Sequence, residues 1–166
     1  MKKNIFLFLL ILSILIVGCN NTSDIKSQTI IENIVLNQST YNDIKNILPE
    51  ADLKQVYNVN TNIFELADGL YAQYTINGVL GELRFDFDKN DRLIHVLFSP
   101  SDYSKESGDS LKAWLFDKYK DYEQITNDTG FIFSNEVENV ELYITENPVD
   151  NTKYHGLYIE WNKINK

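Results

Sequence analysis

Four oxygen-bearing side chains lie within six residues of one another and are the first candidates for chemistry: Asp86, Asp88, Asn90 and Asp91. Carboxylate and amide oxygens at alternating positions are typical of the start of a helix-loop-helix calcium site. Such a loop needs a glycine at the position of Asp91 and a bidentate glutamate at the position of Leu97. The sequence therefore favours an acidic hairpin turn over a calcium site.

The chain has two histidines, His95 and His155, and we expect each to be a polar residue at a strand surface or edge. Two histidines without a cysteine beside them are too few for a zinc site. The sequence holds no phosphate loop, dinucleotide fingerprint or Gly-x-Ser-x-Gly elbow. Any two carboxylates could still come together in the fold as the catalytic pair of a glycosidase, but no sequence pattern indicates which two. We expect no cofactor and no enzymatic activity, and a hydrolase is the least favoured alternative.

Tyrosines of several predicted strands and glutamates of the later ones could form a recognition surface, because tyrosine is enriched at protein interfaces. The candidate surface consists of Tyr71, Tyr74, Glu138, Glu141 and Tyr143. Two alternatives stay open. The tyrosines could simply cover the outer face of a sheet, and the glutamates could protect a sheet edge from aggregation. Further residues of the same kinds lie nearby: Glu136, Glu146, Tyr154 and Tyr158.

The N-terminal segment has the pattern of an export signal. Lys2 and Lys3 are followed by thirteen residues, 5–17, of which only Ser13 is polar. A helix of that length spans roughly 20 Å, which is short of the ~30 Å hydrocarbon core of a membrane. The sequence therefore predicts a signal peptide over residues 1–18 rather than a transmembrane anchor.

Ile16-Val17-Gly18-Cys19 resembles the lipobox of bacterial lipoproteins, and Cys19 is the only cysteine of the chain. The resemblance implies cleavage before Cys19, a diacylglyceryl group on its sulfur and further acylation of the new amino terminus. Two or three acyl chains give stable membrane anchoring. Because Asn20 follows the cysteine, the resemblance implies the outer membrane, facing the periplasm, in a Gram-negative cell. In a cell with one membrane, it implies the outer face.

The composition limits the partners. The chain has 15 basic and 24 acidic residues, and the leader takes two lysines, so the net charge of residues 19–166 is −11. Such a body repels phosphate backbones, and nucleic acid is not an expected partner. It also repels anionic head groups, so attachment to the membrane must come from the lipid. Residues 19–28 are expected to be a flexible tether and 29–166 a single domain.

Periodicity predicts two helices and several strands. A helix is expected over residues 41–48, with Ser39-Thr40 as its cap and Pro49 at its end. A second is expected to begin at a cap formed by Asp109 or Ser110. Strands are expected at 53–59, 63–66, 70–76, 79–87, 93–98, 130–134, 140–145 and 154–161, and residues 29–36 are an ordered lead-in or first strand. Asn77-Gly78 is the strongest hairpin signal.

This order predicts an α+β fold, with antiparallel meanders and two helices packed on one face, in the sequence helix, sheet, helix, sheet. The halves 36–98 and 107–161 share this plan without a visible repeat. They could form one continuous sheet or two small subdomains.

Residues 36–49 and the strand-turn-strand pattern of residues 83–96 resemble outer-membrane-assembly lipoproteins of the SmpA/OmlA type. The general plan is also similar to β-lactamase-inhibitor-like proteins, which double it. The chain lacks that first family's glycines before the helix and after Leu48. The resemblance implies the overall shape of the fold and does not assign a binding role to any residue.

We therefore expect a membrane-anchored lipoprotein of the cell envelope that acts as a non-enzymatic protein-interaction module and binds another envelope protein. The alternative is a binder of a small apolar ligand or envelope lipid between sheet and helices.

Overall fold

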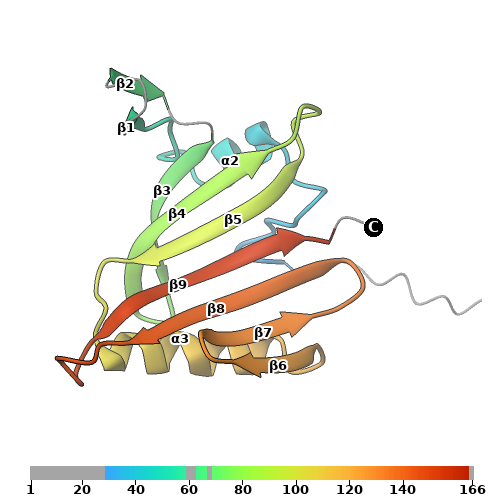
Figure 1. The fold of residues 1–166 in the computed structure, drawn as a ribbon. Coiled ribbons are helices and arrows are strands. Elements are labelled where there is room, and N and C mark those ends of the chain that lie inside the picture. Colours follow the sequence, from blue (N-terminus) through green and yellow to red (C-terminus); the bar gives the residue numbers. More distant parts are fainter. Residues whose placement is uncertain (1–28, 59–62, 67–68, 165–166) are drawn as a thin grey trace, which may run out of the picture.

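The computed structural model describes residues 29–58, 63–66 and 69–164. Its main feature is a seven-stranded antiparallel sheet with the strand order β3-β4-β5-β9-β8-β7-β6 (Figure 1). These strands are β3 (Leu70–Ile76), β4 (Val79–Phe87), β5 (Leu93–Pro100), β6 (Glu123–Asn127), β7 (Gly130–Ser134), β8 (Glu138–Glu146) and β9 (Tyr154–Lys163). A separate hairpin is formed by β1 (Gln55–Asn58) and β2 (Ile63–Leu66), and the described helices are α2 (Tyr41–Ile47) and α3 (Lys105–Lys118).

The two halves of the chain join through β5 and β9, which pair from His95↔Asn162 to Phe98↔Ile159. All seven long strands therefore belong to one sheet, the first of the two arrangements that the sequence left open. The α+β class is confirmed. The predicted alternation of helix, sheet, helix and sheet is not matched, because the strands dominate and both groups of strands merge in a single sheet.

Local signals account for the first helix and the first hairpin. The Thr40 hydroxyl accepts the backbone N–H of Asp43 at 3.2 Å, and the Asp43 carboxylate accepts the N–H of Thr40 at 2.9 Å. This reciprocal capping box fixes the start of α2. Between β3 and β4, Asn77 and Gly78 have φ angles of 47° and 82°, as a tight hairpin turn requires.

The predicted start of the second helix was wrong. The N-cap of α3 is Ser104, whose hydroxyl accepts the N–H of Ser107 at 3.2 Å, so the helix begins at Lys105. Gly108, which precedes the predicted cap, lies inside the helix, where the ring of Tyr154 packs against it. Tertiary contact at this glycine outweighs its poor helix propensity.

Residues 29–36 form turns in which Ile30, Ile34 and Leu36 are fully buried, so the segment is an ordered lead-in, the first of the two alternatives that the sequence left open, and not a strand. One more segment differs from the predictions. Strand β6 was not predicted, because all five of its residues are exposed and it has no apolar periodicity. Within the described ranges, no helix combines the length and the apolar character needed to cross a membrane.

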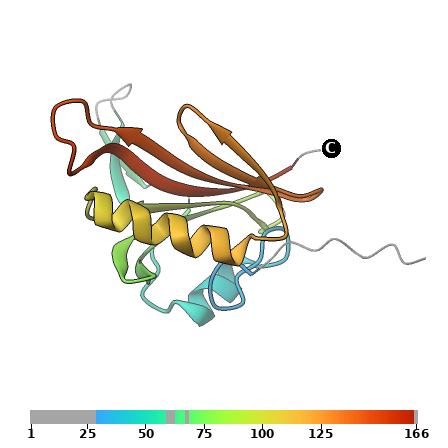
Figure 2. The same cartoon turned by 90° about the horizontal axis from the view of Figure 1, so that it is seen from below.

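The core lies between one face of the sheet and the two helices, which Figure 2 shows on the same side of the sheet. Alternate side chains of each central strand point into it, for example Phe85 in β4 and Phe98 in β5. Leu111 and Leu115 of α3 and its C-cap residue, Tyr119, form one buried stripe. The indole N–H of Trp161 in β9 donates to the Tyr119 hydroxyl at 2.8 Å, which joins the end of α3 to the middle of the sheet.

Candidate functional site

The face of the sheet opposite the helices is the first candidate site, and we call it the open face. In-register pairing aligns one side chain of every strand in a row across it. The row consists of Tyr71, Arg84, Leu97, Glu160, Glu141, Ile132 and Ile125. Aromatic, charged and aliphatic groups are thus mixed on one surface, a composition typical of protein interfaces.

His95 lies between two carboxylates on the open face. Its Nδ1 is 2.6 Å from Asp86 Oδ2, and its Nε2 is 2.9 Å from Glu160 Oε1. Asp86 also accepts a bond from the guanidinium Nε of Arg84 at 2.8 Å. Since a carboxylate only accepts hydrogen bonds, both ring nitrogens must donate, and the geometry fits the imidazolium form.

The pKa directions agree with this geometry. The hydrogen bond to Asp86 is the main reason that the pKa of His95 is raised, and it outweighs the opposing effect of burial. Burial acts to raise the pKa of Asp86, but hydrogen bonds from His95 and Arg84 together lower it. With both nitrogens bonded, His95 has no free lone pair with which to act as a general base. It joins β4, β5 and β9 electrostatically.

Glu141 in β8 stands directly opposite Glu160 in β9. The pKa of Glu141 is raised, first by burial and then by the charge of Glu160. Two like charges in register destabilise a sheet. Glu160 already forms a hydrogen bond with His95. Glu141 is therefore the carboxylate of the pair whose charged form an added cation would stabilise most.

Two tyrosines lie next to this acidic pair. Tyr143 and Tyr158 are cross-strand neighbours whose rings stack at 4.6 Å with an interplanar angle of 12°. The pKa of Tyr158 is raised by burial and then by Glu160 and Glu141. Aromatic faces attract cations, so the stacked pair and the carboxylates favour the same kind of ligand.

The structure separates the five residues predicted as an interaction surface. Tyr71, Glu141 and Tyr143 lie on the open face. Tyr74 points to the helical side, where its hydroxyl donates to Glu32 at 2.9 Å; burial and this hydrogen bond raise its pKa to about 12. Glu138 is fully buried and accepts the Tyr122 hydroxyl at 2.5 Å.

The error has a simple origin. Tyr71 and Tyr74 are three residues apart on a strand, as are Glu138 and Glu141, and an odd spacing places side chains on opposite faces. The four glutamates of the later strands are also dispersed. Besides Glu138 and Glu141, the exposed Glu136 lies in the turn between β7 and β8, and Glu146 lines a cleft.

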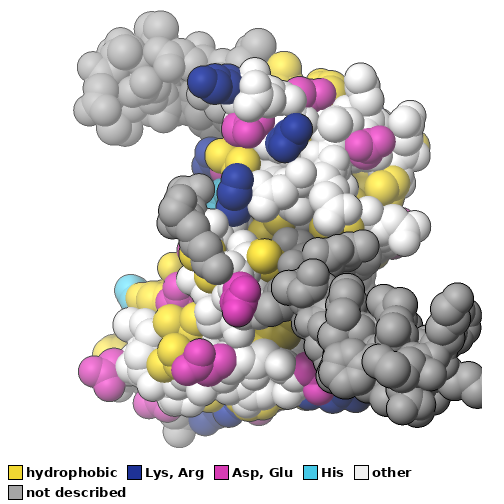
Figure 3. Space-filling model, turned by 90° about the vertical axis from the view of Figure 1, so that its right-hand side faces the viewer, with side chains coloured by type: hydrophobic (Ala, Val, Ile, Leu, Met, Phe, Trp, Pro, Cys, Tyr) yellow, Lys and Arg dark blue, Asp and Glu magenta, His cyan; other side chains and the backbone are white. Residues whose placement is uncertain are grey.

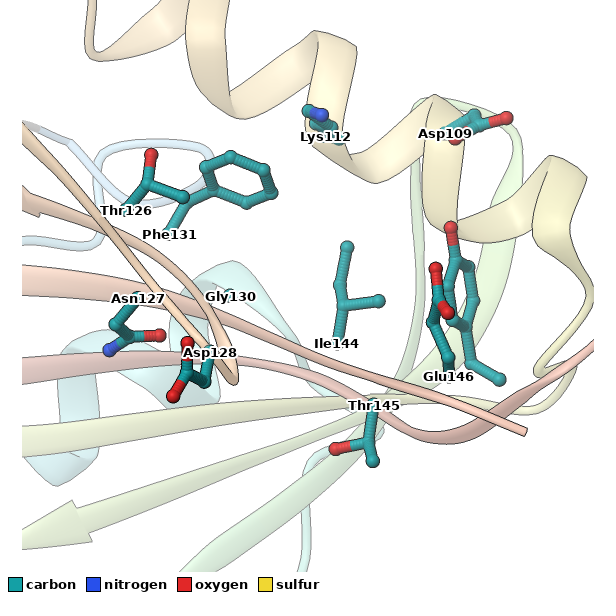
Figure 4. Close-up of a pocket in the computed structure, with 11 residues that line it drawn as sticks. Asp109, Lys112, Thr126, Asn127, Asp128, Gly130, Phe131, Ile144, Thr145 and Glu146 are labelled. Carbon is teal, nitrogen blue, oxygen red and sulfur yellow. The ribbon is translucent and has the colours of Figure 1, made fainter. Parts of the chain in front are cut away.

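That cleft is the second candidate site. It has a volume of about 510 Å³ and lies between α3 and the tip of the β6–β7 hairpin (Figure 4). Phe131 and Ile144 supply apolar lining, and the Lys112 ammonium lies 4.3 Å from the centre of the Phe131 ring. The pKa of Tyr154, at one end, is raised by burial and then by Asp109 and Glu146. The cleft is amphipathic, with carboxylates around an apolar floor.

The acidic turn that opened the sequence analysis has structural tasks. Asp86 bonds His95 and Arg84. Asp88 accepts the N–H groups of Asn90 and Arg92, and Asp91 accepts the N–H of Tyr41 at 3.2 Å. In the part of the chain that the structure describes, no three acidic, histidine or cysteine residues gather in a way that could hold a metal ion.

Charge is not gathered in one large patch on the side of the molecule that Figure 3 shows. Acidic, basic and hydrophobic side chains are interspersed there among the residues described. Selective binding of a partner would therefore depend on a local arrangement of side chains, such as the Glu141–Glu160 pair, rather than on the overall negative charge.

Sequence reasoning did not identify Glu160 and assigned His95 no role in a site, whereas Tyr158 was already among the tyrosines considered for a recognition surface. Asp86 and His95 flank one predicted turn, so their pairing across the hairpin could have been found. Glu160 is 65 residues from His95, and no local pattern indicates that β5 and β9 are neighbours. Comparisons of the chain with protein-family models, with curated proteins and with solved structures find no match.

Proposed function

We propose that this protein is a membrane-anchored, non-enzymatic interaction module of the cell envelope that binds a partner protein through its open face. The observation that carries the proposal is the pair Glu141 and Glu160, two half-buried carboxylates in register beside the stacked rings of Tyr143 and Tyr158. A lysine or arginine side chain of the partner would relieve their repulsion and contact the aromatic faces.

The surroundings support a surface that is preorganised for binding. The sheet is held by main-chain pairing, and the Asp86–His95–Glu160 bridge fixes the side chains next to the acidic pair. At the far side of the face, cations already use an aromatic surface in this way: the Lys54 ammonium lies 5.4 Å and the Arg84 guanidinium 6.0 Å from the ring centre of Tyr71.

The anchor in this proposal is Cys19, in the lipobox-like segment, which lies outside the described residues. Acyl chains on this residue would hold the domain at the outer membrane facing the periplasm, or at the outer face of a single membrane. Ten residues, 19–28, would form the tether, and such a segment reaches at most ~35 Å when extended. The partner would then be another envelope protein close to the same membrane.

Photocrosslinking in intact cells tests the binding surface. A photoreactive residue at position 143 samples the open face, and one at Asp117, exposed on α3, is the control. We expect a discrete crosslinked product at 143 that Glu141→Gln weakens strongly. Glu106→Gln removes the same charge from an exposed position of α3 and should leave the product unchanged. Equal products at 143 and 117, or no effect of Glu141→Gln, would contradict the proposal.

The anchor is tested separately. Mass spectrometry of the protein extracted from membranes should show an acylated Cys19 as the first residue. Cys19→Ser should move the protein to the aqueous phase of a detergent partition. An unmodified thiol would contradict the anchor and would leave the assignment of the open face standing.

A second function is favoured by the cleft beside α3. Its lining of Phe131, Ile144 and Tyr154 with nearby carboxylates fits a small amphipathic ligand such as an envelope lipid fragment. Titration with a fluorescent fatty acid tests this reading. We expect Ile144→Gln to weaken binding and Leu80→Gln, at an exposed position of β4, to leave it unchanged. Equal affinity of Ile144→Gln and Leu80→Gln for the fatty acid would exclude the cleft as its binding site.

A further inference from the structure

Strand β6 is the outermost strand of the sheet, and its outer edge has no neighbour among the described residues. All five of its side chains are exposed. Seen from below in Figure 2, α3 lies beside the β6–β7 hairpin and does not cover that edge. The strand contains no proline, lysine or bulge, and its one charged side chain, Glu123, stands at its first position. An added strand therefore has access to it.

The opposite edge of the sheet differs. There, the backbone N–H of Tyr71 in β3 donates to Asp52 at 2.9 Å, and the N–H of Asp52 donates to Tyr71 at 3.0 Å. The 51–54 segment thus occupies part of the β3 edge, and the Lys54 side chain adds a charge beside it. Because the β3 edge is partly occupied, β6 is the edge at which we expect a further strand to pair.

The backbone groups that β6 offers can be identified from its register. Asn127 pairs with Gly130 across a two-residue turn, and such a turn closes on a hydrogen-bonded pair. Hydrogen-bonded pairs alternate along an antiparallel ladder. The N–H and C=O groups of Glu123, Ile125 and Asn127 therefore point to β7, whereas those of Gln124 and Thr126 point outward.

The strand is complementary to itself. In an antiparallel pair centred on Ile125, the outward groups of Gln124 in one copy meet those of Thr126 in the other, and the two positions can exchange both hydrogen bonds. Ile125 then lies opposite Ile125, and Glu123 lies opposite the amide of Asn127 rather than another glutamate. No like charges meet across the strand pair.

The side chains extend the argument to the open face. Ile125 pairs with Ile132 of β7, and it is 45% exposed. In the centred arrangement, Ile132 and Ile125 of both copies form a continuous aliphatic stripe across the symmetry axis. This stripe would cover an isoleucine that a single copy leaves in water.

We propose that two copies of this chain associate through β6, in antiparallel register about Ile125, and join their sheets into one. A single five-residue strand pair buries less area than stable dimers do, so the association is weak and depends on concentration. Confinement to a membrane surface would raise the local concentration. The dimer rests on the β6 edge alone and does not require the partner-binding function of the open face.

Variants of the full chain with one introduced cysteine, studied in membranes, test the register. Position 125 of the two copies forms a non-hydrogen-bonded pair, with Cα atoms ~4.5 Å apart, within the range that a disulfide requires. We expect mild oxidation to give a severalfold higher yield of disulfide-linked dimer for Ile125→Cys than for Gln124→Cys. Glu123→Cys and Asn127→Cys should crosslink when coexpressed, and neither should do so alone. The wild-type chain, whose only cysteine is Cys19, gives the background.

Sedimentation of the full chain in detergent provides a second measurement. Gln124→Pro removes an outward-pointing N–H, and Gln124→Ala is the matched control that keeps it. We expect the wild type and Gln124→Ala to show concentration-dependent dimers and Gln124→Pro to be monomeric, with unchanged tryptophan fluorescence as evidence of folding. Equal crosslinking at positions 124 and 125, crosslinks to other proteins only, or a monomeric wild type at all concentrations would overturn the proposal.

Discussion

The bridge from Asp86 through His95 to Glu160 predicts a specific pH dependence of stability. The pKa of His95 is raised in the folded protein, so its contribution is complete below the unfolded pKa of ~6.5 and is lost as the pH rises through the folded value. The pKa of Asp86 is lowered, so its contribution is lost as the pH falls through its folded value. The bridge should be strongest between these limits, at mildly acidic pH.

The magnitude follows from the contacts. His95→Gln removes charge-assisted contacts of 2.6 and 2.9 Å, and such bonds contribute ~1.5–3 kcal/mol each when well shielded. The side chains are 19–29% exposed, which weakens them by solvent screening. We expect a net loss of about 1–3 kcal/mol at pH 5.5. One titrating group can change stability by at most ~1.4 kcal/mol per pH unit.

Urea unfolding provides the assay, with tryptophan fluorescence as its signal, because Trp161 is fully buried and Trp114 packs against it at 6.4 Å. The free energy of unfolding is compared at pH 5.5 and pH 8.5. We expect the wild type to lose more stability over this range than His95→Gln does. The exposed His155 supplies the control, and His155→Gln should behave as the wild type.

Groups facing His95 from neighbouring strands must be considered in the same experiment. Arg84 and Asp86 lie on β4, Glu160 on β9, and Glu141 one strand further on β8. These groups are present in both the wild type and His95→Gln, and His95 lowers the pKa of Asp86, so the difference between the two proteins reports the histidine together with its effect on Asp86. Identical pH dependence of the two proteins would refute the assigned bridge, as would a wild type whose histidine-dependent stability increases toward pH 8.5.

Three further predictions concern single positions. Tyr119→Phe leaves the buried indole N–H of Trp161 without the acceptor it has at 2.8 Å and should cost ~1–3 kcal/mol in urea unfolding; an unchanged midpoint would contradict the bond. Glu141→Gln should increase stability at pH 7, because the raised pKa of Glu141 means that its charged form is disfavoured in the folded protein, while partner capture decreases; the idea fails if the variant is less stable than the wild type. Gly108→Ala normally stabilises a helix, but here the new methyl group would overlap the ring of Tyr154, so we expect a loss of ~1 kcal/mol in thermal or urea unfolding, and a gain would show that the ring yields.

Much of the local structure could be predicted from the sequence because its causes are local. The capping box of Thr40 and Asp43 and the turn at Asn77-Gly78 each depend on residues within one turn of the chain. In residues 83–87, apolar and polar side chains alternate, and the apolar residues Leu83 and Phe85 are the ones that face the core in β4. Segments with weak or mixed signals were misplaced or missed: the N-cap of α3 is a serine followed by polar residues, and β6 has no apolar pattern.

The candidate site could not be predicted in the same way. Tyr71 and Glu141 share the open face, whereas Tyr74 and Glu138 lie on the other side of the sheet. His95 and Glu160 form a bridge across 65 residues of chain. These relations depend on which strands pair and in which register, and a shift of one residue would move every side chain to the other face.

The sequence by itself determined the leader-like segment with Cys19, the acidic composition, the α+β class and the side-chain alternation of strands with a clear apolar pattern, such as β4. Only the tertiary structure decided that β5 pairs with β9, that one sheet results, and that Glu141, Glu160 and His95 become neighbours. The physical reason is that propensity and periodicity act within a few residues, whereas the pairing of distant strands is selected by the apolar surface that the whole chain buries at once.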